Sequence, residues 1–368
     1  MTIAVAVALL AAACGDDSGN SSSATTAAGG ASSSAAGGAG TTAAGGASTT
    51  EAVKLSGNLQ GSGSSLSLAF LQEAASDFNK AHSGVEVTYG GGGSGKGRTD
   101  LAQKTVDYAG SDSPYKDADK PAEPILYFPI LLGPITVSFN VPGVDSLNLT
   151  PDTIAKIFQR DITNWNDPAI AADNAGVKLP DLDITVAHRS DGSGTTQNFT
   201  EWLVVASPSV WKLKSGSTVE WPADTQAGNG NQGVAQIVQS TSGAIGYIDL
   251  SDAAAAGLKY ASVKNQAGDF IQPTSEAASK AGEGVEINPD LTFHAYNSSA
   301  PGAYPITAQT FVIIYTQQTD ASKGQLNKAF ISYLLTDGQS LLTDLDYAPL
   351  SKNIQDKAIA QLDQIQIG

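Results

Sequence analysis

The sequence contains few of the residues that build disulfides, metal centres and nucleic-acid surfaces. Its 368 residues include one cysteine and three histidines, so no internal disulfide can form and a metal site would consist mostly of carboxylates. Twenty Lys and Arg residues stand against 36 Asp and Glu residues, a formal net charge of −16. This charge argues against a nucleic-acid partner. It permits a buried site for a small anion, because distant surface charges are screened over about 10 Å in 0.1 M salt.

The apolar run at the start of the sequence is too short to cross a bilayer. It extends from Met1 to Ala13 and ends in small residues directly before Cys14. One interpretation is an export signal, residues 1–14, whose cleavage leaves Cys14 first and modified by lipid; the other is a buried free thiol. We favour the signal, which resembles that of bacterial lipoproteins although Ala11 stands where leucine is usual. The lipid would then anchor an exported protein to the outer face of the cytoplasmic membrane, at the cell surface or in the periplasm.

Residues 15–50 consist almost entirely of Gly, Ser, Ala and Thr. Such a composition cannot bury enough apolar surface to offset the entropy of ordering. We therefore expect a flexible tether with a root-mean-square reach of about 30–35 Å. The full length exceeds a usual single core, and at roughly 150 residues per domain it favours two domains with a cleft between them.

From Val53 onward, short β-rich runs alternate with helical patterns, which is typical of α/β layers around mainly parallel sheets. Strands are predicted at residues 85–89, 184–188 and 311–315. Helical spacing of apolar residues occurs within residues 70–78, 199–203 and 330–335. The aromatic side chains in these helical segments fit a hydrophobic core better than a cofactor site.

Three Gly/Ser turns each follow a predicted strand and open a predicted helix, at residues 61–66, 90–95 and 192–196. Glycine lets the backbone approach a ligand, hydroxyl groups donate hydrogen bonds, and free N–H groups of a first helical turn attract an anion. Any one of these turns could instead be a simple helix cap. Three together favour a site for an oxyanion.

Three charged residues beside the turns suggest how such a site would work. Arg189 offers a planar fork of donors for two oxygens of a tetrahedral anion, and Asp191 could fix its orientation; the alternative is a surface ion pair of little energetic value. Asp112 could accept the proton that phosphate carries at neutral pH and repel sulfate, which carries none. Its alternative role is that of a turn aspartate bonded to its own backbone.

Given these residues, the chain resembles the phosphate-binding proteins of bacterial ABC-type phosphate uptake systems from about Lys54 to its end. The most specific motif is Arg-Ser-Asp-Gly-Ser-Gly-Thr at residues 189–195. Supporting stretches lie at residues 105–112, 165–167, 228–233, 243–247 and 344–347. The resemblance implies a periplasmic-binding-protein-like fold of type II: two α/β domains joined by a hinge of crossover strands, with the ligand in the cleft. Domain I would comprise residues 51–135 and 305–368, and domain II residues 136–304.

The resemblance also implies the ligand contacts and the partners. The phosphate-binding residues would be Ser65, the N–H of Leu66, Ser94, Asp112, Arg189, Ser193, Gly194 and Thr195. Asp191 would orient Arg189. The Ser65-Leu66 pair replaces the family's usual Thr-Phe, which keeps the hydroxyl and the N–H. Partners would be inorganic phosphate and the membrane permease and ATPase subunits of a phosphate ABC transporter, with no catalytic residue, metal or cofactor. Lys96 and Arg98, close behind Ser94, would add positive potential or face solvent, and we expect solvent.

Three alternatives differ in function. Residues 90–97 nearly match the phosphate loop G-x-x-x-x-G-K-[ST], but Gly97 has no hydroxyl for magnesium. Ser193 with His188 and Asp191 could form a hydrolase triad, although no G-x-S-x-G elbow surrounds Ser193. The same fold could also serve as a surface adhesin or a sensor, or could bind another oxyanion.

Overall fold

The computed structural model describes residues 55–368. The predicted signal segment, Cys14 and the tether at residues 15–50 lie outside these described residues. Within residues 55–368, no helix combines the length and the apolar character that a membrane crossing requires.

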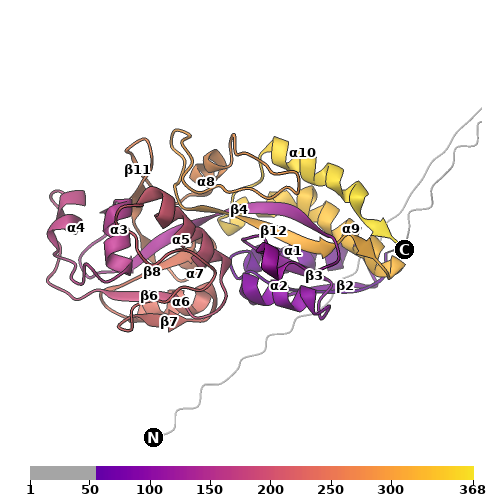
Figure 1. Ribbon diagram of the computed structural model, residues 1–368, viewed down its shortest axis with the longest axis horizontal. Coiled ribbons are helices and arrows are strands. Elements are labelled where there is room, and N and C mark those ends of the chain that lie inside the picture. Colours follow the sequence, from indigo (N-terminus) through magenta and orange to yellow (C-terminus); the bar gives the residue numbers. More distant parts are fainter. Residues whose placement is uncertain (1–54) are drawn as a thin grey trace, which may run out of the picture. The chain divides into compact units, whose positions relative to one another are not determined.

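A nine-stranded mixed sheet organises the described chain (Figure 1). In spatial order its strands are β2 (Val85–Gly92), β1 (Gly57–Gly63), β3 (Tyr108–Ser111), β12 (Thr307–Tyr315), β4 (Ile125–Asn140), β8 (Ala244–Asp249), β6 (Thr185–Arg189) and β7 (Gln226–Gly228), while β9 (Lys259–Tyr260) pairs with β4. A three-stranded sheet contains β11 (Phe270–Ile271), β10 (Ser262–Lys264) and β5 (Asn148–Leu149). A two-stranded sheet contains β13 (Gln317–Gln318) and β14 (Gln366–Ile367). The three predicted strands are confirmed as β2, β6 and β12.

Strand direction divides the sheet into outer and central parts. The outer strands β2, β1 and β3 pair in parallel, as do β8, β6 and β7 at the other end. The central pairs β3–β12, β12–β4 and β4–β8 are antiparallel. The expectation of mainly parallel sheets is therefore wrong for the centre, because the apolar runs that predict strands carry no information on their direction.

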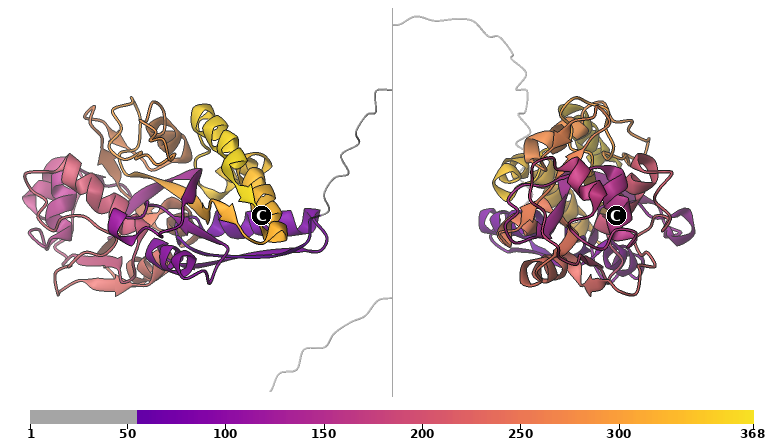
Figure 2. Two further views of the ribbon diagram at one scale, coloured as in Figure 1. Left: turned by 45° about the vertical axis from the view of Figure 1, so that its right-hand side comes forward. Right: turned by 90° about the vertical axis from the view of Figure 1, so that its left-hand side faces the viewer.

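Ten α-helices accompany these strands within residues 55–368 (Figure 2). They are α1 (Leu68–Ala81), α2 (Ser94–Ala102), α3 (Pro151–Phe158), α4 (Pro168–Asp173), α5 (Gly194–Ala206), α6 (Gly230–Ser240), α7 (Leu250–Ala255), α8 (Ser275–Ala281), α9 (Ala321–Leu335) and α10 (Lys352–Gln361). The predicted helical segments are confirmed as α1, α5 and α9. Helix α9, from near the C-terminus, packs against β1 and α1, so both ends of the described chain build the same part of the molecule.

Strand β4 runs the length of the structure and is buried at every position except its two ends. It pairs with β12 from Ile125 to Pro134 and then with β8 from Ile135 to Asn140. The predicted boundary after Ile135 lies one residue beyond the point where the partner strand changes. The division into two domains stays a prediction, and β4 and β12 are the strands that would form its hinge.

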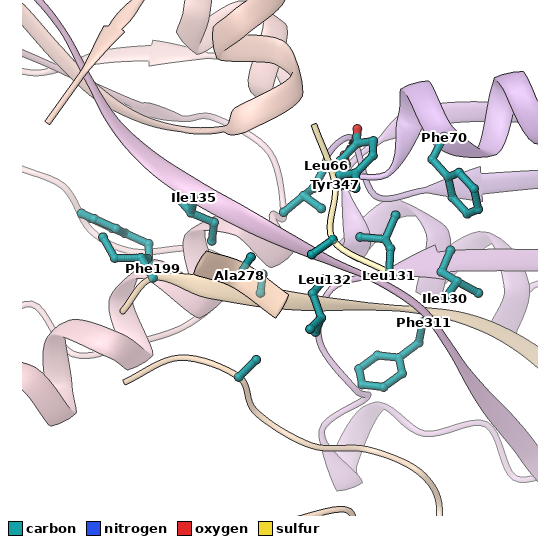
Figure 3. Packing of buried hydrophobic residues seen from close by; sticks show 14 of the residues in the cluster. Leu66, Phe70, Ile130, Leu131, Leu132, Ile135, Phe199, Ala278, Phe311 and Tyr347 are labelled. Carbon is teal, nitrogen blue, oxygen red and sulfur yellow. Dashed lines mark hydrogen bonds between the residues drawn. The ribbon is translucent and has the colours of Figure 1, made fainter. Parts of the chain in front are cut away.

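The core is built around β4 (Figure 3). Leu131, Leu132 and Ile135 project from this strand, with Phe311 of β12 beside it. The aromatic side chains assigned to the core by helical spacing are buried: Phe70, Phe78, Phe199, Trp202 and Phe330. Burial of each large apolar side chain contributes about 1.5–3 kcal/mol. This packing fixes the strand ends from which the polar turns emerge.

Candidate functional site

The three Gly/Ser turns do connect strands to helices: β1 to α1, β2 to α2, and β6 to α5. In two of them a serine hydroxyl accepts from backbone N–H groups just ahead of it, and in the third turn this serine, Ser193, is the N-cap of α5. Ser64 Oγ accepts from the N–H groups of Leu66 (3.1 Å) and Ser67 (3.3 Å), and Ser193 Oγ accepts from Thr196 N–H (3.0 Å). Leu66 N–H and Ser193 Oγ therefore already have local partners. The same residue types serve helix capping and anion binding.

The second turn has no such cap. The residue before α2 is Gly93, at φ 90°, and it makes no side-chain cap hydrogen bond. A Cβ at Gly93 would lie 2.1 Å from Asp191 Oδ2, so only glycine allows this close approach. Gly95 N–H donates to Gly192 O at 2.7 Å. The second and third turns are thus in backbone contact.

Arg189 ends β6 and is 4% exposed. Its Nε and Nη2 donate to the two carboxylate oxygens of Asp191 at 2.8 and 2.5 Å. Its Nη1 makes longer bonds to Asn231 Oδ1 (3.2 Å) and Thr195 Oγ1 (3.4 Å). The pair is buried, so the alternative of a surface ion pair is wrong. The edge of the guanidinium that carries Nε and Nη2 is fixed by Asp191. Its Nη1 contacts neutral groups, which an anion could replace as acceptors.

Asp191 holds Arg189 in place and is itself held. Burial favours the neutral form of this carboxyl, but hydrogen bonds and charge from Arg189 outweigh burial and place the pKa of Asp191 below its ordinary value. Gly230 N–H also donates to Asp191 Oδ1 at 3.0 Å. Asp191 therefore stays ionised and tempers the charge of the arginine.

Asp112 follows β3 directly and is 1% exposed. Its Oδ1 accepts from Ser64 Oγ (2.5 Å) and Thr310 Oγ1 (2.7 Å), and its Oδ2 from Ser94 Oγ (3.2 Å). These partners are remote in sequence, which contradicts the simple turn aspartate. Burial raises the pKa of the Asp112 carboxyl, although these three hydrogen bonds and the charge of Arg189 oppose the rise.

The two charged groups belong to one buried cluster. A Cβ at Gly194 would lie 2.4 Å from Ser94 Oγ and 2.6 Å from Asp112 Oδ2, so the start of α5 touches the carboxylate directly. Asn231 N–H donates to Ser65 Oγ at 3.2 Å, and Asn231 also contacts Arg189. The structure thus brings together all the residues that the sequence predicted for the site, of which all but the partly exposed Asp191 are buried: Ser65, Leu66, Ser94, Asp112, Asp191 beside Arg189, Ser193, Gly194 and Thr195.

Several residues of the cluster were not predicted as site residues. Asn231, at the start of α6, links Arg189, Thr195 and Ser65. Its position in Gly-Asn-Gly-Asn at residues 228–231 was the available signal, since a fourth strand, β7, enters a helix there. Thr310 lies inside a continuous β-strand, and nothing in the sequence marks it.

The expectation that Lys96 and Arg98 both face solvent holds for only one of them. Lys96 is exposed and pairs with Asp100, as expected. Arg98 is partly buried and is bonded to protein groups: its Nη1 donates to Ser111 Oγ and Ser113 Oγ, both at 2.8 Å. The two cations stand two positions apart on one helix, so they lie on different faces of it.

The alternative hydrolase triad of Ser193, His188 and Asp191 is not formed. The His188 ring stacks on Trp221 at 5.1 Å, and its Nδ1 pairs with Arg189 O at 2.9 Å. Burial lowers the pKa of His188. Ser193 Oγ faces Thr196 N–H, as a helix cap does. Neither side chain is placed to activate the other.

Comparison with known proteins adds sequence relatives. A family model described as "PBP superfamily domain" matches residues 19–338. The chain is 34% identical over 311 residues to the phosphate-binding protein PstS of Xylella fastidiosa (strain Temecula1), covering 83% of this chain and 84% of that protein. It is 35% identical over 312 residues to PstS of Pasteurella multocida, with coverages of 82% and 89%. It is likewise 35% identical over 313 residues to PstS 3 of Mycobacterium leprae, with coverages of 81% and 84%.

Solved structures share the fold. A high-affinity periplasmic phosphate-binding protein bound with phosphate matches with a TM-score of 0.71 at 22% identity, over 85% of this chain and 96% of that one. A putative phosphate ABC transporter substrate-binding protein from Clostridium perfringens, with bound phosphate, matches with a TM-score of 0.60 at 19% identity, over 80% and 100%. At these identities the likeness concerns the fold alone.

Proposed function

This chain belongs to the PBP superfamily and, within it, to the PstS phosphate-binding proteins, and on that premise we propose that it binds inorganic phosphate outside the cytoplasm and delivers it to an ABC transporter for import. Its fold is the type II periplasmic-binding-protein fold. The role requires capture and release of an unchanged ion, so no bond is made or broken in the ligand.

The observation that carries the proposal is the meeting of Arg189 and Asp112 in one buried cluster. Arg189 supplies donors and positive charge to the oxygens of the anion. Asp112 supplies an acceptor, which only an oxyanion that still carries a proton can satisfy. With sulfate, the anion and the Asp112 carboxylate would face each other as two negatively charged groups without a shared proton, at a cost of several kcal/mol.

Ser94 connects the two roles. A serine hydroxyl has one proton, and Ser94 directs it at Asp112 Oδ2 over 3.2 Å. When phosphate donates its own proton to that oxygen, the Ser94 hydroxyl is free to turn and donate to a phosphate oxygen. The exchange keeps every buried acceptor satisfied, which a ligand without a proton cannot achieve.

The remaining contacts surround the anion with neutral donors. We assign them to Ser65, Leu66, Ser193, Gly194 and Thr195, with Asp191 holding Arg189. Each hydrogen bond to the charged ligand contributes about 1.5–3 kcal/mol before ordering and desolvation are subtracted. A micromolar dissociation constant corresponds to only about −8 kcal/mol, so a few such bonds suffice.

The attachment and the partners form the finer part of the proposal. Lipid on Cys14 would hold the chain at the membrane, and residues 15–50 would let the binding part reach the permease. The permease and its ATPase subunits would then open the closed protein and take the ion. The sequence of residues 1–50 supports this arrangement by composition and by its single cysteine.

Calorimetric titration of the full chain tests the proposal. We expect phosphate to bind with a dissociation constant of about 1 µM or lower, and sulfate to bind at least about 100-fold more weakly. Absence of phosphate binding at micromolar concentrations would overturn the proposal. Tight sulfate binding would instead indicate a carrier of another oxyanion, and no binding of either ion would favour an adhesin or sensor.

A further inference from the structure

Arg98 is a partly buried cation that the proposed ligand contacts do not use. It lies in α2, four residues after Ser94, so both side chains occupy the same face of the helix. In the described part of the chain its hydrogen-bond acceptors are neutral: Ser111 Oγ (2.8 Å), Ser113 Oγ (2.8 Å) and Ser113 O (3.2 Å). Removing a charge from water costs free energy that neutral acceptors only partly restore. We therefore expect the position of Arg98 to serve a role other than stability.

The two serines flank Asp112. Ser94 Oγ accepts from the N–H of Asp112 at 3.1 Å and donates to its Oδ2. The first turns of α2 therefore hold three consecutive residues: Arg98 holds Ser111 and Ser113, and Ser94 holds the residue between them. Ser111 Oγ also donates to Ser113 O at 2.6 Å, which closes the turn on itself.

The charge of Arg98 acts on the same carboxylate. Burial lowers the pKa of Arg98, and the negative charge of Asp112 opposes that effect. The ring of Tyr115 lies under the guanidinium at 5.9 Å and its hydroxyl donates to Arg98 O at 2.5 Å, which fixes the arginine from its other side. Arg98 is thus a fixed positive group behind the acceptor of the site.

A carboxylate discriminates against an unprotonated anion only if it cannot turn away from it. A mobile Asp112 would rotate, relieve the repulsion and admit sulfate. We propose that Arg98 is a positioning residue that fixes Asp112 toward the ligand and so sets the preference for a protonated oxyanion over an unprotonated one. This inference rests on the proposed function, because it concerns the selectivity of that same site.

The test compares phosphate and sulfate affinities of the full chain in Arg98→Met, Arg98→Lys and Lys96→Met. Lys96→Met removes the same charge from an exposed position of the same helix. We expect Arg98→Met to lower the ratio of phosphate to sulfate affinity about tenfold, and Arg98→Lys to restore most of it, because the ammonium group can donate to both serines. Lys96→Met should keep the ratio within about twofold.

An unchanged ratio in folded Arg98→Met overturns the inference, and so does an equal loss of both affinities, which would indicate a purely structural role. If Arg98→Met does not fold, the double variant Ser111→Ala, Ser113→Ala makes the same comparison with the arginine in place. A lowered ratio in that variant supports the inference and an unchanged ratio overturns it. Failure of the parent chain to bind phosphate would instead count against the proposed function.

Discussion

Arg189 and Asp112 are opposite charges in one buried cluster, and each has its own set of partners. Asp191 neutralises most of the arginine's charge and fixes its orientation. Hydroxyl groups surround the Asp112 carboxylate, which keeps it an acceptor although burial raises its pKa. In the proposed function, the charge of Arg189 attracts an oxyanion, and the charge of Asp112 requires that the oxyanion carry a proton.

The arginine is tested by truncation. Arg189→Ala removes the charged donors and leaves Asp191 buried and unpaired, so we expect phosphate binding to weaken at least about tenfold. Lys212→Ala is a suitable control, because it removes the same charge from an exposed pair with Asp161. Calorimetry of both variants measures the difference. Parental affinity in Arg189→Ala would remove this residue from the site.

If Asp112 faces the anion, the affinity for sulfate should depend on pH. Sulfate is a suitable probe because it does not itself gain or lose a proton in this pH range. The folded-state pKa of Asp112 is raised by burial, so acidification protonates it earlier than an exposed aspartate. Protonated Asp112 no longer repels sulfate and becomes a donor. Sulfate affinity of the parent chain should therefore rise as pH falls through this pKa, and should fall again as pH rises above it.

Asp112→Asn should abolish that pH dependence. The amide carries no charge at any pH, so we expect sulfate affinity to be raised at neutral pH, by about tenfold or more, and nearly constant with pH. Phosphate affinity should fall, since the amide nitrogen cannot accept the phosphate proton. A ratio of phosphate to sulfate affinity equal to that of the parent would refute the role of Asp112 as proton acceptor.

At the scale of elements, the start of α5 must fit against the residues of two other turns. Gly194→Ala would place a Cβ 2.4 Å from Ser94 Oγ and 2.6 Å from Asp112 Oδ2. In Gly192→Ala the new Cβ would have its nearest neighbour at 3.4 Å, an ordinary contact, so this variant is a matched control. We expect Gly194→Ala to reduce phosphate affinity at least about tenfold, despite a helix propensity better by up to about 1 kcal/mol.

Binding and thermal unfolding of both glycine variants separate the two effects. The melting temperature of Gly194→Ala should change little if the turns simply move apart, while its affinity falls. Equal affinities for the two variants would mean that the start of α5 does not need to approach Ser94 and Asp112 so closely.

The elements that the sequence predicted well are those with local signals. Glycine and serine mark the turns at residues 61–66, 90–95 and 192–196, and the structure has a strand-to-helix connection at each. Sequence could not show which hydroxyls in these turns also make local backbone contacts, as those of Ser64 and Ser193 do, because a local contact and an anion contact require the same residue types. The distinction depends on which direction each turn faces after folding.

Contacts between distant segments were the part that sequence could not supply. Thr310 reaches Asp112 across the paired strands β12 and β3 of the sheet, at a separation of 198 residues. The antiparallel centre of the sheet and the partial burial of Arg98 have the same origin, since both depend on tertiary packing and not on local pattern. The resemblance to phosphate-binding proteins predicted the site residues, while the residues that contact them could be identified only from the structure.

For the molecule as a whole, the hydrogen bonds that join the turns suggest closure around the ligand. Gly95 N–H donates to Gly192 O, and Asn231 N–H donates to Ser65 Oγ. If the proposed domains open without ligand, these amides exchange with solvent in the open state. Phosphate should then slow their hydrogen exchange at least about tenfold by binding the closed state.

Hydrogen–deuterium exchange on the full chain measures this protection in peptides covering residues 90–98 and 228–233. Peptides from β4 should exchange equally slowly with and without phosphate, because this buried strand is paired along its whole length, first with β12 and then with β8. Sulfate at the same concentration should protect neither region. Phosphate binding without added protection in the two turns would show that the ligand does not hold the molecule closed.

The location of the anion is the central claim, and anomalous diffraction from crystals grown with arsenate tests it most directly. Arsenate shares the shape, charge and protonation of phosphate, and near its absorption edge arsenic scatters anomalously far more strongly than the sulfur of sulfate or the oxygen of water. The account predicts one strong arsenic peak between the Arg189 guanidinium and the Asp112 carboxylate. An arsenic peak elsewhere, or arsenate bound with Asp112 facing away from it, would contradict the account.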